Sequence, residues 1–114
     1  MGTNYYVVPN RPSVVEPIHI GKSSVGWMFL FHDVDELYYD VPIVWHSYEE
    51  VKDWLYKYTV EFKSYVIINE YDEIISFDDF IELVEYKQQF KDNPDNFTYC
   101  RNVNGYRFDE REFC

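Results

Sequence analysis

Two segments of this chain begin with a serine that is followed three positions later by an acidic residue. Ser47 and Glu50 form the first such pair, and Ser76 and Asp79 form the second. A serine at this place caps the first turn of a helix, because its hydroxyl accepts a hydrogen bond from an amide that the helix leaves unpaired. The sequence therefore predicts two helices, one in the middle of the chain and one in its second half.

Each predicted helix carries one apolar stripe that repeats at the period of 3.6 residues typical of an amphipathic helix. The stripes consist of Val51, Trp54, Leu55 and Tyr58 in the first helix and of Phe77, Phe80, Ile81 and Val84 in the second. The first helix is expected to end at Thr59 and Val60, and the second before residues 93–96. A single apolar stripe must be buried against another element, so both helices are expected to pack against a sheet.

Segments rich in β-branched and aromatic residues predict the strands of that sheet. Three of them precede the first helix and are expected to form an antiparallel meander: residues 3–8, 18–20 and 27–32. A polar turn over residues 22–26 is expected to join the second strand to the third. Residues 33–40 are interpreted as a solvated acidic loop, and residues 42–45 as a short extended piece.

Two further pairs of strands are predicted. Residues 65–68 and 73–75 predict a hairpin between the helices, and Asn104-Gly105 predicts a turn between residues 99–103 and 106–108. The expected fold class is α+β: a small antiparallel sheet, made of the N-terminal meander plus the later hairpin, packed against two helices. With no repeats or linkers in 114 residues, the whole of 1–114 is expected to form a single domain.

Hydrophobic residues make up 46% of the chain, which excludes an intrinsically disordered protein. The aromatic residues are 12 Tyr, 9 Phe and 3 Trp, which is more rings than one small core can hide. Some tyrosines are therefore expected at the surface, where aromatic residues are typical of binding patches. This surplus is consistent with a homodimer.

The chain shows no signal for export or for membrane insertion. Its N-terminus lacks a basic segment followed by an apolar run. Its longest apolar run, residues 25–31, is shorter than the roughly 20 residues of a membrane span. The two cysteines, Cys100 and Cys114, do not make a disulfide framework. A cytoplasmic protein is therefore expected.

The net charge of −11 comes from 21 acidic and 10 basic residues, and it is unevenly distributed. Residues 1–32 carry one acid and two bases, whereas residues 33–63 carry eight acids and three bases, and residues 64–114 carry twelve acids and five bases. Such a field repels nucleic acid and anionic membranes and attracts basic partners. The charge therefore predicts a protein partner with a basic surface, and no direct contact with nucleic acid or membrane.

Two runs without Lys or Arg concentrate this charge, over residues 33–50 and 70–85. If the two runs lie on one surface, they could imitate a nucleic acid and occupy the surface of a protein that normally binds it. Side chains three or four positions apart on a helix are neighbours, so part of the second run shares one helix face. The residues predicted to bind a partner, including two tyrosines as anchors, are Asp33, Asp35, Glu36, Tyr38, Tyr39, Glu70, Asp72, Glu73, Asp78, Glu82 and Glu85.

A turn at residues 21–24, Gly-Lys-Ser-Ser, supports an alternative hypothesis: a module that binds and sequesters a small ligand or nucleotide. The segment looks like the end of a phosphate-binding loop. However, that loop needs a glycine where this chain has Glu16, and a strand rather than a helix is predicted to follow. Nucleotide hydrolysis is therefore not expected. The ligand-binding residues of this hypothesis are His19, Lys22, Ser23, Ser24 and Trp27.

No catalytic or metal-binding signature is present, and no cofactor is predicted. The chain has no Gly-x-Ser-x-Gly elbow, and Cys100 has no histidine near it in the sequence. The histidines at positions 19, 32 and 46 lack the close spacing of structural zinc ligands. Residues 33–44 lack the glycine and the final glutamate of a calcium loop. Binding rather than catalysis is therefore expected.

Residues 19–31, which begin His-Ile-Gly-Lys-Ser-Ser-Val-Gly-Trp, resemble a segment of a family of small, mostly uncharacterised bacteriophage proteins. The overall plan is also similar, with an Asn-Tyr-Tyr strand at residues 4–6, a helix containing Trp54, an acidic helix within residues 70–85 and a Phe-containing tail at residues 112–113. Many members carry a Cys-x-x-Cys knuckle that this chain lacks, so no metal role is carried over. The resemblance implies a phage protein, made inside a bacterium, that binds and inhibits a host or antiviral-defence protein.

Overall fold

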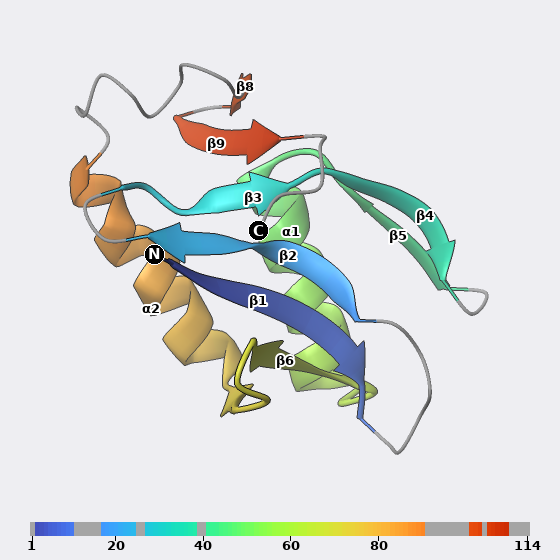
Figure 1. Ribbon diagram of the computed structural model, residues 1–114. Helices are drawn as coiled ribbons and strands as arrows, with labels where there is room; N and C mark the ends of the chain where they lie inside the picture. Colours follow the sequence, from blue (N-terminus) through green and yellow to red (C-terminus); the bar gives the residue numbers. More distant parts are fainter. Residues whose placement is uncertain are drawn as a thin grey trace.

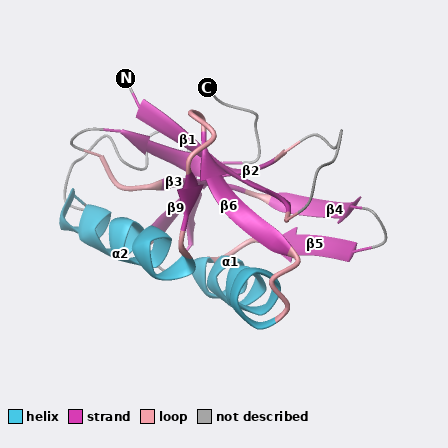
Figure 2. Cartoon of the chain, turned by 90° about the horizontal axis from the view of Figure 1, so that it is seen from below, coloured by secondary structure: helices cyan, strands magenta, loops and turns pink. Residues whose placement is uncertain are grey.

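The computed structural model describes residues 2–10, 17–24, 27–38, 41–90, 101–103 and 105–109. These residues form a sheet and a separate two-stranded hairpin that extends to one side (Figure 1). Figure 2 shows both α-helices on the same face of the sheet. The predicted α+β class, with a sheet packed against two helices, is confirmed.

Seven strands in the described part of the chain pair in the order β7-β6-β1-β2-β3-β9-β8. Their bounds are Gly2–Pro9 for β1, Ile18–Ser24 for β2, Leu30–His32 for β3, Tyr65–Asn69 for β6, Ile74–Ile75 for β7, Arg101–Val103 for β8 and Tyr106–Asp109 for β9. Neighbours are antiparallel except β3 and β9, which run parallel. The sheet is thus mixed, and it is larger than the one predicted because β9 adds to the edge of the meander.

The observed pairs of strands that follow each other closely in the chain agree with those predicted from the sequence. The meander β1–β2–β3 is confirmed, and so is the hairpin β6–β7, which joins the sheet through β1. The predicted pair around Asn104-Gly105 is present as β8 and β9. Gly105 has a φ of +89°, a conformation that glycine adopts at little cost, which explains the glycine at this place.

Two predictions about the connections are wrong. The predicted turn over residues 22–26 is wrong for its first three positions, because β2 continues to Ser24 and Lys22 pairs with both Asn4 and Leu30. The third strand begins at Leu30 instead of Trp27. The sequence missed the longer strand because its polar residues are held by pairing with β1, and Lys22 also by pairing with β3, rather than by an apolar pattern of their own.

The predicted acidic loop at residues 33–40 is also wrong, since most of it forms a strand. β4 (Val34–Tyr38) and β5 (Val41–Trp45) make an antiparallel hairpin. Val34 and Trp45 face each other and are buried, whereas the neighbouring pair of Asp35 and Val44 is exposed. The alternation typical of a half-buried strand is therefore present. The acidic residues of β4 made this alternation hard to recognise in the sequence. The predicted extended piece at residues 42–45 is confirmed as part of β5.

Both helices begin at the predicted serines. α1 (Tyr48–Leu55) continues as a π-helical segment, η1 (Tyr56–Glu61), and α2 (Phe77–Lys87) ends in a 3-10 turn, η2 (Gln88–Phe90). The Glu50 amide donates to the Ser47 hydroxyl over 3.3 Å, and the Asp79 amide donates to the Ser76 hydroxyl over 3.1 Å. The Glu50 carboxylate in turn accepts from the His46 amide over 3.1 Å. The predicted end of the second helix, at residues 93–96, lies outside the described residues.

Phenylalanine rings fill the space between the sheet and the helices. Phe29, Phe31, Phe80 and Phe108 are all fully buried. The ring of Phe29 lies 4.7 Å from that of Phe31 and meets Phe80 of α2 edge-on at 5.4 Å, while Phe31 stacks on Phe108 of β9 at 5.0 Å. Both predicted stripes face this core, with only their end residues, Tyr58 and Phe77, partly exposed.

We expect Gly21→Ala to destabilise the protein. A Cβ at this position of β2 would lie 2.3 Å from the Leu30 carbonyl oxygen and 2.4 Å from the Phe29 ring, so the sheet would have to shift. Overpacking of this kind costs about 1–3 kcal/mol. Urea denaturation followed by circular dichroism measures the free energy of unfolding. Ser23→Ala, two positions along the same strand, is the control, and an equal effect of both variants would contradict the close-packing explanation.

Candidate functional site

The outward faces of α1 and α2 carry a dense set of acidic side chains. The two helices lie on the same face of the sheet (Figure 2), and their buried stripes point into the core. The seven acids that they contain are all exposed: Glu49, Glu50, Asp53, Asp78, Asp79, Glu82 and Glu85. We call these seven residues the acidic helix layer. The layer includes three of the residues predicted to bind a partner, in positions where a partner could reach them.

The two lysines of these helices neutralise little of this layer. Lys87 is only 6% exposed, and its ammonium donates to the Ser24 carbonyl and lies 5.3 Å from the Phe90 ring centre. Burial lowers the pKa of Lys87. Lys52 is half exposed and lies 3.9 Å from the Glu85 carboxylate. The surface that faces outward from the helices is therefore strongly negative.

The two acidic runs meet where α1 begins and α2 ends. The Tyr48 hydroxyl donates to the Glu85 carboxylate over 3.0 Å, and the Tyr48 ring stacks on Tyr106 of β9 at 4.3 Å. Burial, followed by the hydrogen bond to Glu85, raises the pKa of Tyr48, and burial with the charges of Glu85 and Glu49 raises the pKa of Tyr106. The contact therefore holds the C-terminal part of α2 against the start of α1 and places acids of both runs on one surface.

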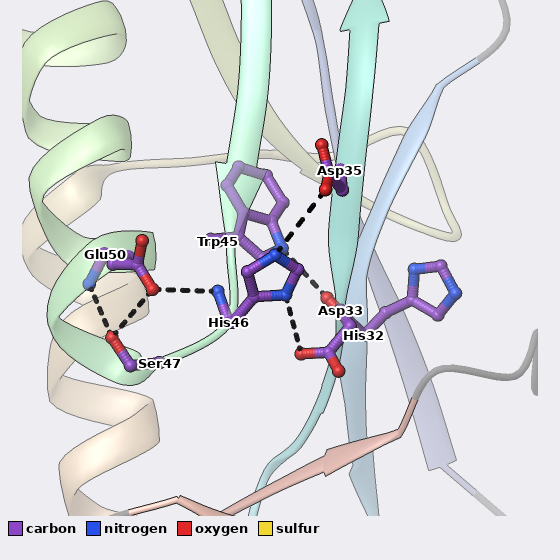
Figure 3. Close-up of polar contacts among 7 residues, drawn as sticks. All are labelled: His32, Asp33, Asp35, Trp45, His46, Ser47 and Glu50. Atoms are coloured by element: carbon purple, nitrogen blue, oxygen red, sulfur yellow. Dashed lines mark hydrogen bonds and ion pairs between the residues drawn. The ribbon is translucent and has the colours of Figure 1, made fainter.

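The first acidic run also surrounds a histidine at the base of the β4–β5 hairpin. Figure 3 shows the His46 imidazole between two carboxylates, with Nδ1 3.6 Å from Asp33 and Nε2 3.9 Å from Asp35. The Asp33 side chain is only 6% exposed, whereas that of Asp35 is open to solvent. Asp33 is therefore poorly placed to bind a partner. No group of three or more His, Cys, Asp or Glu residues in the described ranges is arranged to hold a metal ion.

Acids of the β6–β7 hairpin take part in the structure of the hairpin itself. The Glu70 carboxylate accepts from the backbone amide of Asn4 over 2.7 Å, and that of Glu73 accepts from the Asn69 side chain over 2.8 Å. Asp72 has a φ of +62°, which suits a short polar side chain at a tight turn. All three side chains are exposed, but their positions have a structural explanation.

The two runs therefore converge only in part. The β6–β7 hairpin forms one edge of the sheet, whereas the β4–β5 hairpin follows β3, near the opposite edge (Figure 1). Residues 33–38 and 70–73 thus lie on different sides of the molecule, and the helices carry the acids that come together. Glu36 and Tyr38 lie in β4, but their side chains, and all of Tyr39, are outside the described residues.

The Gly-Lys-Ser-Ser turn on which the alternative ligand site depends is part of a strand in the structure. Residues 21–24 belong to β2, where pairing with β1 and, at residues 21–22, with β3 engages the strand, so their amides do not form an open cradle for an anion. The His19 ring stacks between Tyr6 at 5.1 Å and His32 at 5.7 Å. Trp27 lies in the connection to β3, under the guanidinium of Arg107 at 5.4 Å.

The sequence did not predict an apolar groove that the structure shows beside the acidic helix layer, with Asp78 belonging to both. Its volume is about 560 Å³, and it lies between η1, the β6–β7 hairpin and the first turn of α2. Three exposed apolar side chains at its border could have signalled it, because they fall outside the predicted buried stripes: Tyr56, Val60 and Ile74. Recognising that they share a groove requires the tertiary structure.

Comparisons with models of protein families, with curated protein sequences and with solved structures found no match. The phage-family resemblance therefore remains a prediction. In the ranges that the structure describes, no helix combines the length and apolar character needed to cross a membrane.

We expect the free energy of unfolding to fall as the pH rises past about 10. The pKa values of Tyr5, Tyr48 and Tyr106 are raised above 10.0, mainly by burial. At alkaline pH the unfolded chain therefore releases phenolic protons that the folded chain keeps, whereas at neutral pH these groups contribute no pH dependence. Lys87, with its lowered pKa, acts in the opposite direction but is a single group.

Tyr48→Phe tests this interpretation. The variant should lose about 1 kcal/mol at neutral pH, because it lacks the hydrogen bond to Glu85, and it should show a shallower loss of stability at alkaline pH. Urea midpoints measured across the pH range give both quantities. Tyr71→Phe, at an exposed tyrosine, should change neither. An alkaline slope identical to that of the unmodified protein would argue against the buried Tyr48 hydroxyl as a cause.

Proposed function

We propose that this chain is a phage-encoded interaction protein that binds and inhibits a host or antiviral-defence protein in the bacterial cytoplasm. The acidic helix layer would contact a basic surface of that partner, such as one that binds nucleic acid. The observation that carries the proposal is the exposure of seven acids on two helices of one face of the sheet. The resemblance to small phage proteins supports the phage origin and the inhibitory role.

The arrangement of the helices favours binding over a merely solvated surface. Acids one turn apart on a helix lie ~5–6 Å from each other and repel, so concentrating them on adjacent helices has a cost in stability. Duplex DNA carries one charge per ~1.7 Å of its axis, and a single helix is much sparser. Two helices joined through the Tyr48–Glu85 contact present two such rows together, which brings the charge density nearer to that of a nucleic acid.

Neutralising the layer should weaken binding far more than neutralising acids elsewhere. Asp53→Asn, Asp79→Asn and Glu82→Gln together remove three charges that take part in no described side-chain contact. At about 0.5 kcal/mol for each exposed charge pair, the dissociation constant should rise about tenfold. The partner is first captured on the tagged protein from a nuclease-treated lysate of the bacterial host, identified, purified and then titrated by calorimetry.

The matched control carries Asp109→Asn, Glu110→Gln and Glu112→Gln. It removes the same number of charges at positions outside both acidic runs of the sequence and outside α1 and α2, so it tests location rather than net charge. Affinity should also fall steeply between about 0.05 and 0.5 M salt, because exposed charges are screened within ~10 Å. Equal loss in both triple variants, or affinity that is insensitive to salt, would refute the helix layer as the binding surface. A nucleic acid that binds the partner should compete.

A further inference from the structure

The groove between η1, β6–β7 and α2 is lined mainly by apolar side chains that no other described element covers. Tyr56 and Val60 come from η1, Ile74 from the short edge strand β7, and Phe77 from the start of α2. The Tyr56 and Phe77 rings meet edge-on at 5.4 Å and hold two of the walls together. A volume of about 560 Å³ lies within the range of sites that take ligands or side chains.

The segment that lines one side of the groove has an unusual conformation. η1 is π-helical over six residues, and Tyr56, Thr59 and Val60 of this segment line the groove. π-Helical segments are rare and occur frequently at functional sites, because they place side chains where an α-helix would not. The segment ends at Glu61, Phe62 caps it, and the next residue, Lys63, has a φ of +54°. An α-helical continuation would have turned Val60 relative to Tyr56 and changed this wall.

The surroundings of the groove are negative. Residues 56–63 and 70–79 flank it, and they contain six acids against two lysines. Asp78 belongs to the lining itself, as does Lys63. An apolar groove within an acidic surround matches a segment that combines a large apolar residue with basic residues. The same charge opposes a second copy of this chain, because two such surrounds would repel each other.

We infer that this groove docks a short segment of the partner protein in which an aromatic or aliphatic residue is followed closely by Lys or Arg. The apolar side chain enters between Val60, Ile74 and Phe77, and the basic side chain reaches the Asp78 carboxylate. The inference rests on the proposed function in one respect, that the segment belongs to a protein partner. It adds a second contact, with its own specificity, to the electrostatic one of the helix layer.

Model peptides test the groove before the partner protein is identified. The probe is a blocked hexapeptide, Gly-Phe-Leu-Lys-Arg-Gly, titrated into the isotopically labelled protein and followed by NMR. Two companion peptides replace Lys-Arg by Glu-Glu, or Phe-Leu by Gly-Gly. We expect chemical-shift changes confined to residues 56–63, 65–67 and 74–78, with a dissociation constant of about 0.1–1 mM. Each companion peptide should bind at least about tenfold more weakly.

A matched pair of protein variants locates the binding. Val60→Trp fills the groove, whereas Val44→Trp places the same side chain on β5, away from the groove; the two valines are similarly exposed, at 37% and 42%. The first variant should bind the probe at least about tenfold more weakly and the second should bind it normally. Asp78→Asn should reduce the preference for the basic peptide over the acidic one. The peptide with Gly-Gly in place of Phe-Leu should still bind this variant more weakly than the probe does.

Several results would overturn the inference. They are no shift changes in the groove at millimolar peptide, equal binding of the acidic companion, or equal binding by the Val60→Trp and Val44→Trp proteins. Groove shifts that depend on protein concentration without peptide would instead identify a second copy as the occupant. Failure of the charge-neutralised helix layer to affect partner binding would leave these peptide results untouched, so the two proposals can fail separately.

Discussion

The packing of aromatic rings between the sheet and the helices is the constraint on which the rest of the structure depends. Phe29 and Phe31 project from the meander, Phe108 adds the parallel strand β9, and Phe80 anchors α2. Because each ring contacts another element, the helices are held on one face with their apolar stripes inward. The polar sides of both helices must then point outward together, and the acidic helix layer is a direct consequence.

Some of the ionisable groups contact other parts of the fold. Glu85 accepts a hydrogen bond from Tyr48, Glu70 binds the backbone of β1, and Asp33 lies largely buried beside His46. Lys87, which could offset the helix layer, is instead buried against Ser24. Repulsion among the remaining exposed acids, which the packing brings onto one surface, lowers stability. The proposed basic partner would relieve that repulsion.

The local features of the fold could be predicted from the sequence, and the non-local ones could not. Helix starts at Ser47 and Ser76 depend on contacts within one turn, so spacing alone reveals them. The extension of β2 to Ser24 and the β4–β5 hairpin depend on pairing with distant segments. Polar or acidic residues in these strands carry no strong β signal by themselves, and the turn and loop predictions failed there for that reason.

The sequence by itself determined the net charge, the two capped amphipathic helices, the central strands and the excess of aromatic residues, because composition and short-range periodicity record these properties directly. Only the tertiary structure decided which acids share a surface, since this depends on how α1 and α2 lie against the sheet. It also separated the two acidic hairpins and formed the groove from η1, β7 and α2. Surfaces of this kind are made by residues far apart in the chain, and their proximity is a property of packing, which no local pattern encodes.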